Sequence, residues 1–160
     1  MTHFDAEREV LRVLVADDGM GIRESLAEND RFRNITEEEA VRLCLEDSVT
    51  DGKGMGFGLY ATSRLMKDVG LQFVIHSGHH KLVSKDGVTE TVENGLWQGT
   101  IVYMEISTNE ESNSFSDECI AKLLLEMPLE KLKQLTTFRN LTPMAERSIL
   151  VALQRRYKMQ

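Results

Sequence analysis

The residues best suited to chemistry lie in two short motifs that are rich in glycine. The first, residues 17–22 with the sequence DDGMGI, places an acidic side chain directly after an apolar run. The second, residues 54–59 with the sequence GMGFGL, precedes a segment of helical spacing. A carboxylate accepts a hydrogen bond from an exocyclic amine, and the N–H groups of a glycine turn that opens a helix bind phosphate oxygens. The two motifs together predict a nucleotide pocket.

Asp17 is the residue that we expect to recognise the base. Residues 10–16 predict a strand in the interior of a sheet, so Asp17 would stand at the end of a buried strand, where a carboxylate needs a partner. An adenine amine would donate to it a charge-assisted bond of about 1.5–3 kcal/mol, whereas guanine would present a carbonyl oxygen. Gly19 and Gly21 would let the backbone approach the flat base. The alternative is an ordinary turn after a strand.

The second motif is suited to a phosphate group. Gly54, Gly56 and Gly58 open a helix predicted over 57–69, whose first turn would offer free N–H groups and the positive end of a dipole. Lys53 would add a charge-assisted contact. The alternative is a flexible loop that enters a packed helix. A dinucleotide turn or a Walker loop does not fit, because no clear strand precedes the motif and no Lys-Ser or Lys-Thr pair follows it.

Strands and a further helix must hold these motifs in place. A capping box at Thr36 predicts a helix within the otherwise polar segment 23–53. Residues 71–77 and 99–106 predict strands, and the Asp86-Gly87 pair between them predicts a hairpin turn. We therefore predict an α/β fold for this part of the chain.

The last third of the chain has a different character. Residues 107–116 read as a polar linker, and apolar spacing beyond it predicts helices near 117–126, 128–137 and 143–158. We predict an α/β domain over 1–107 and a helical tail over 108–160. The apolar helix faces within 117–158 would dock a protein partner, allow self-association, or fold back onto the sheet, and the sequence leaves these alternatives open.

Composition and charge narrow the class of protein. The net charge is −7, and residues 1–121 carry 11 basic against 23 acidic side chains, which argues against a nucleic-acid partner. No apolar run approaches the roughly 20 residues of a membrane span, and no signal peptide is recognisable. Two cysteines form neither a disulfide framework nor a metal cluster. We expect a cytoplasmic protein without a membrane partner.

The two motifs resemble glycine boxes of the GHKL ATPase superfamily, which groups gyrase-type topoisomerases, heat-shock chaperone ATPases, sensor histidine kinases and MutL proteins. Residues 17–22 resemble the first box, residues 54–59 the second, and residues 97–102, with the sequence WQGTIV, the third. The order, the approximate spacing and the expected elements agree over residues 10–106, about two thirds of the chain.

This resemblance implies a two-layer α/β sandwich of the Bergerat type, with a mixed sheet, helices on one face, and ATP between the helices and a mobile lid. The lid would comprise residues 23–53. Asp17 would bind the adenine amine with support from Thr100, while Gly19, Gly21 and Ile22 would line the base. The complete set implied to bind the nucleotide is Asp17, Gly19, Gly21, Ile22, Lys53, Gly54, Gly56, Gly58, Leu59 and Thr100.

One part of the family pattern is missing. The family places a helix before the first box, with an Asn that holds Mg²⁺ and, in hydrolysing members, a Glu that activates water. Here nine residues precede the first predicted strand, and none of them is Asn. We therefore expect weakened ATP binding, Mg²⁺ without a protein ligand, no catalytic residue, and an uncovered area of sheet. The chain would be part of a longer ATPase or a non-catalytic relative.

The leading hypothesis is an ATP-binding module of this superfamily with a signalling or regulatory role. The alternative is a non-catalytic interaction domain that has lost the nucleotide and works through its tail. His76, His79 and His80 are expected to be exposed residues of a hairpin rather than metal ligands. Cys44 and Cys119 are expected to be packing or surface residues rather than nucleophiles.

Overall fold

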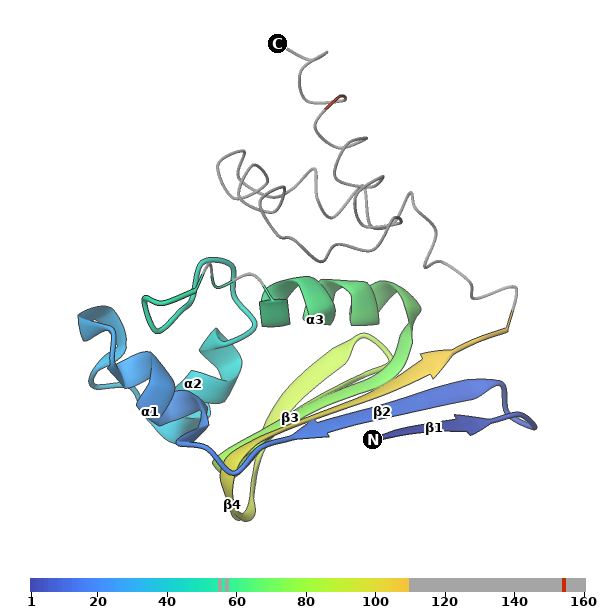
Figure 1. Cartoon of the computed structure of the whole chain (residues 1–160), viewed down its shortest axis with the longest axis horizontal. Coiled ribbons are helices and arrows are strands. Elements are labelled where there is room, and N and C mark those ends of the chain that lie inside the picture. The colour runs from blue at the N-terminus through green and yellow to red at the C-terminus, as the bar shows by residue number, and fades with distance from the viewer. Residues whose placement is uncertain (55, 57, 110–153, 155–160) are drawn as a thin grey trace. The chain divides into compact units, whose positions relative to one another are not determined.

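The computed structural model describes residues 1–54, 56, 58–109 and 154, apart from the side chains of residues 68 and 69. Its helices and strands all belong to the unit Met1–Ser112 (Figure 1). They are β1 (Thr2–Asp5), β2 (Val10–Ala16), α1 (Gly21–Ala27), a 3-10 turn (Asp30–Phe32), α2 (Glu37–Leu43), α3 (Gly58–Val69), β3 (Gly70–Lys85) and β4 (Val88–Ser107). The predicted tail, residues 108–160, lies outside the described residues except for 108, 109 and 154.

The four strands form one sheet in the order β1-β2-β4-β3. The predicted strand over 10–16 is confirmed as β2, and it lies in the sheet interior between β1 and β4. All three pairings are antiparallel, so the expectation of a mixed sheet is wrong for these strands. The reason is the connection: a tight hairpin turns the chain back from β3 into β4, and β4 then runs opposite to both of its neighbours.

Three helices lie on one side of this sheet, which gives a two-layer arrangement of helices and strands (Figure 1). The helices pack on β3 and β4 around the buried side chains of Phe73 and Ile75. Leu82 on β3 and Val102, Met104 and Ile106 on β4 complete the sheet side of this core. The helix side consists of Ile22, Leu26, Phe32, Ala40, Val41, Cys44 and Met66. Burial of these apolar side chains is the main contribution that holds the two layers together.

The other half of the same sheet face has no comparable helix cover. Val15 on β2 is paired with Val102 and therefore shares its face, yet Val15 is 59% exposed. Phe4 on β1 is paired with Leu11 and is 55% exposed. The helix layer of the described residues therefore covers β3 and β4 but leaves an apolar strip over β1 and β2.

The hairpin between β3 and β4 is confirmed at its predicted turn. Asp86 and Gly87 both have positive φ, 51° and 77°, as a two-residue turn of the favoured type requires. The strands are longer than the segments 71–77 and 99–106 that the sequence predicts, because β3 continues to Lys85 through bulges near Gly78. The apolar alternation is interrupted there, although the pairing is not.

The polar segment 23–53 is more ordered than its composition suggests. The predicted helix begins after Thr36 with a complete capping box to Glu39 and becomes α2. A further helix, α1, is not predicted, because it has only seven residues and no side-chain N-cap. Ala40 and Val41 of α2 are fully buried. Residues 37–43 are therefore part of the core rather than a lid.

Cys44 is expected to be a packing or surface residue rather than a nucleophile. Cys44 is buried, and burial raises the pKa of its thiol to about 12, so the thiol stays protonated at neutral pH and is no nucleophile. Cys119 lies outside the described residues.

Within the part of the chain that the structure describes, no helix has the length and apolar character needed to cross a bilayer.

Candidate functional site

The first and third motifs meet where β2 ends beside β4. The Asp17 N–H donates to the Thr100 carbonyl oxygen at 2.9 Å, and the Trp97 indole N–H donates to the Asp17 carbonyl oxygen at 3.1 Å. Gly99 lies against the same backbone: a Cβ on Gly99 would be 2.2 Å from the Asp17 carbonyl oxygen. Gly99 also has a φ of 92°, which favours glycine. Two segments about 80 residues apart in sequence thus form one junction.

Ser77 on β3 connects this junction to the start of α1. Its hydroxyl accepts from the Ile22 N–H at 2.9 Å and donates to the Gly99 carbonyl oxygen at 2.8 Å. Gly21 approaches the same hydroxyl, because a Cβ on Gly21 would be 2.8 Å from it. The Ser77 side chain is buried, so both bonds are shielded from water. Ser77 is not among the residues predicted from the sequence, because its only signal is a hydroxyl within an apolar strand.

The Asp17 side chain is exposed, which corrects the expectation of a buried carboxylate. No helix packs over this end of β2 in the described structure, so the side chain meets solvent. One carboxylate oxygen accepts from the Gly19 N–H at 2.8 Å, a local bond typical of an Asp turn. The other oxygen has no hydrogen-bond partner among the described residues. That oxygen is available to accept from an amine.

The second motif is held by the segment that precedes it. The Thr50 hydroxyl donates to the Gly54 carbonyl oxygen at 3.0 Å. Gly56 has a φ of 63°, and a Cβ there would be 2.4 Å from the Val49 carbonyl oxygen. The Lys53 ammonium is paired with the Glu28 carboxylate at the end of α1. Lys53 therefore has an internal partner, and both side chains of this ion pair are exposed.

The structure does not bring the second motif to the junction. No hydrogen bond among the described residues links residues 54–58 to residues 17–22 or 97–100. Figure 1 shows α2 between the turn after β2 and the start of α3. Ile22 is buried in the core, and Leu59 is partly buried and packs against that core. Gly58 is the first residue of α3 and has open space around it.

A separate cluster joins the start of α2 to the bulge in β3. The Glu37 carboxylate accepts from the His79 N–H at 2.9 Å and lies 3.1 Å from His79 Nδ1. It also lies 3.6 Å from His80 Nδ1, a buried atom without a hydrogen bond. Gly78 makes room for it, because a Cβ there would be 2.6 Å from the Glu37 carboxyl carbon. No cluster that could hold a metal ion occurs in residues 1–54, 56, 58–109 and 154.

This cluster makes part of the free energy of unfolding dependent on pH. The His79 N–H bond lowers the pKa of Glu37, so the stabilisation is present above the ordinary glutamate pKa and is lost as pH falls through the lowered value. Glu37→Gln is expected to lose roughly 1 kcal/mol at pH 7. Urea unfolding from pH 7 to pH 3 should show this difference shrinking in acid, whereas the exposed control Glu93→Gln should stay close to the parent. A difference that persists at pH 3 would contradict this role.

Comparisons with known proteins do not identify the site. No protein-family model and no curated protein matches this sequence. The case for a ligand site therefore depends on the contacts between residues 17–22 and 97–100. Those contacts place the exposed Asp17 carboxylate beside glycine backbone and close to β4, the strand that carries Trp97.

Proposed function

We propose that the chain is an ATP-binding module of the GHKL superfamily with a signalling or regulatory role. The observation that supports it best is the junction of the first and third motifs, where Asp17 meets Gly99 and Thr100. In the proposal, the free carboxylate oxygen of Asp17 accepts from the adenine amine. Gly19 and Gly21 leave the backbone open beside the base. Thr100 holds the Asp17 backbone at the position that this recognition needs.

The adenine half of the site fits the residues present better than the phosphate half does. Asp17 offers an exposed acceptor, whereas Lys53 is paired with Glu28 and the second motif lies apart from the junction. We therefore propose adenine recognition with weak overall affinity and no hydrolysis by this chain. The lid role is kept only for the irregular residues 45–53, because residues 37–43 form a buried helix. Mg²⁺ would arrive with ATP, and we assign it no protein ligand.

A second candidate function is a non-catalytic interaction domain. The apolar strip over β1 and β2, with Phe4 and Val15 more than half exposed, favours it. Apolar side chains that are exposed together on one sheet face commonly mark a place where another element packs. The predicted tail surface, residues 117–158, lies outside the described residues apart from residue 154 and adds no support.

Asp17→Asn tests the proposal most simply. Titration calorimetry with Mg-ATP should give at least about tenfold weaker binding for this variant, because one charge-assisted hydrogen bond is lost. Asp18→Asn is the matched control, since Asp18 is an exposed neighbour of the same charge, and it should bind as the parent does. Equal affinities for the parent and Asp17→Asn would overturn the base assignment. An absence of binding at millimolar ATP would favour the interaction domain.

A further inference from the structure

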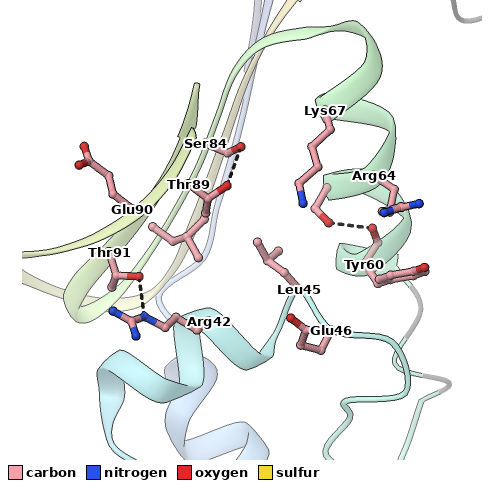
Figure 2. Close-up of a pocket in the computed structure, with 12 residues that line it drawn as sticks. Arg42, Leu45, Glu46, Tyr60, Arg64, Lys67, Ser84, Thr89, Glu90 and Thr91 are labelled. Atoms are coloured by element: carbon pink, nitrogen blue, oxygen red, sulfur yellow. Dashed lines mark hydrogen bonds between the residues drawn. The ribbon is translucent and has the colours of Figure 1, made fainter. Parts of the chain in front are cut away.

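A cavity lies between α2, α3 and the β3–β4 hairpin (Figure 2). It is separate from the junction of the first and third motifs, because the two share no residue. Its volume is about 590 Å³, within the range of small-molecule sites. Leu45 and Leu82 give it an apolar floor, and polar side chains form its walls. None of its lining residues belongs to the proposed adenine site, although Leu45 and Glu46 lie at the start of the segment proposed as the lid. The cavity therefore needs an explanation of its own.

Three cations line this cavity from two helices. Arg42 comes from α2, while Arg64 and Lys67 come from successive turns of α3. Figure 2 shows the Lys67 ammonium pointing into the space between α3 and the hairpin. The lining also contains two acidic residues, Glu46 and Glu90. Figure 2 shows the Glu90 carboxylate pointing away from the other lining side chains. Three cations are unusual here, because residues 1–121 carry about twice as many acidic as basic side chains.

Hydroxyl groups complete the polar wall. The Thr91 hydroxyl accepts from Arg42 Nε at 3.1 Å, and the Glu38 carboxylate accepts from Arg42 Nη2 at 2.6 Å, so both partners hold the guanidinium at the hairpin side of the cavity. The Thr89 hydroxyl donates to the Ser84 hydroxyl at 3.1 Å on the same wall (Figure 2). Guanidinium and ammonium groups together with hydroxyl donors are the groups that bind phosphate oxygens in proteins.

We propose that this cavity binds a small phosphorylated molecule, with Arg42 and Lys67 contacting its phosphate oxygens and Arg64 adding positive charge at the rim on the outer side of α3. The apolar floor of Leu45 and Leu82 would take the uncharged part of the ligand. The site is independent of the proposed adenine site, because the two share no residue. A ligand bound here contacts α2, α3 and the hairpin at once, and it would stabilise their packing.

The test measures the binding of inorganic pyrophosphate, used as the probe, to the full chain by titration calorimetry at low salt. We expect saturable binding that weakens at least tenfold in Arg64→Gln/Lys67→Gln and weakens as salt is raised. Arg33→Gln is the matched control, because Arg33 is an exposed cation outside the cavity, and it should bind as the parent does. Lys67→Arg should retain binding, which separates loss of charge from loss of fold.

Two further variants separate this site from the nucleotide site. Asp17→Asn and Lys53→Gln should leave pyrophosphate binding unchanged, because neither residue lines the cavity. If Lys53→Gln weakens pyrophosphate binding and the double variant does not, the probe binds at the second glycine motif and the cavity proposal is wrong. Absence of pyrophosphate binding to the parent chain would overturn it as well, whatever the outcome for ATP.

Discussion

Replacement of Gly99 by alanine is expected to lower the free energy of unfolding by about 2–5 kcal/mol, from left-handed strain and steric overlap together. The new Cβ would lie 2.2 Å from the Asp17 carbonyl oxygen, and backbone cannot move aside as a flexible side chain can. The φ of 92° adds strain for any residue with a Cβ. Because the Asp17 turn must shift, ATP binding should be lost together with the stability. Urea unfolding and calorimetry measure the two effects.

Gly87→Ala is the matched control for this prediction. Gly87 also has a positive φ, 77°, but a Cβ there meets nothing within 4 Å. Its cost should be limited to the left-handed strain, about 1–2 kcal/mol, and its ATP binding should be unchanged. If Gly99→Ala is no more destabilising than Gly87→Ala, the close contact between the first and third motifs is wrong.

Phe73→Ala is expected to cost about 3–5 kcal/mol, the usual range for a fully buried aromatic side chain. Phe73 is 1% exposed on β3, on the face where the helices pack. Its removal would leave a cavity between the sheet and the helix layer. Chemical denaturation of the parent and the variant gives the difference in unfolding free energy, and the far-ultraviolet spectrum checks that the variant still folds.

Phe4→Ala tests the uncovered half of the same face. Phe4 is 55% exposed on β1, so its truncation should cost less than about 1 kcal/mol. A large cost for Phe4→Ala would show that another element covers β1 and β2 in solution. A small cost for Phe73→Ala would contradict the packing of the helices on β3.

Local signals suffice for several elements of this fold. The interior strand over 10–16, the capping box at Thr36 and the turn at Asp86-Gly87 are predicted correctly, because each depends on residues close together in the chain. The extension of β3 is not predicted, because Gly78 and the polar residues after it interrupt the apolar alternation. Pairing with β4 overrides this weak local preference.

The candidate site depends on long-range contacts, and the sequence predicts it only in part. The family resemblance implies that Thr100 supports Asp17, and the structure brings the backbones of the two residues into contact. The sequence cannot reveal the role of Ser77, because a single serine in a strand has no distinctive signal. It also cannot place the second motif, since the packing of α2 against β3 decides where α3 begins relative to the junction.

A comparison of ATP and GTP binding is the sharpest test of adenine recognition by Asp17. Trp97 is the only tryptophan in the chain, and its indole bonds to the Asp17 backbone, so its fluorescence reports on the junction. ATP should change this fluorescence saturably, and equilibrium dialysis should give at least about tenfold weaker binding for GTP, because guanine presents a carbonyl where Asp17 needs a donor. Equal binding of the two nucleotides, or binding of neither at millimolar concentration, would contradict an adenine site at Asp17.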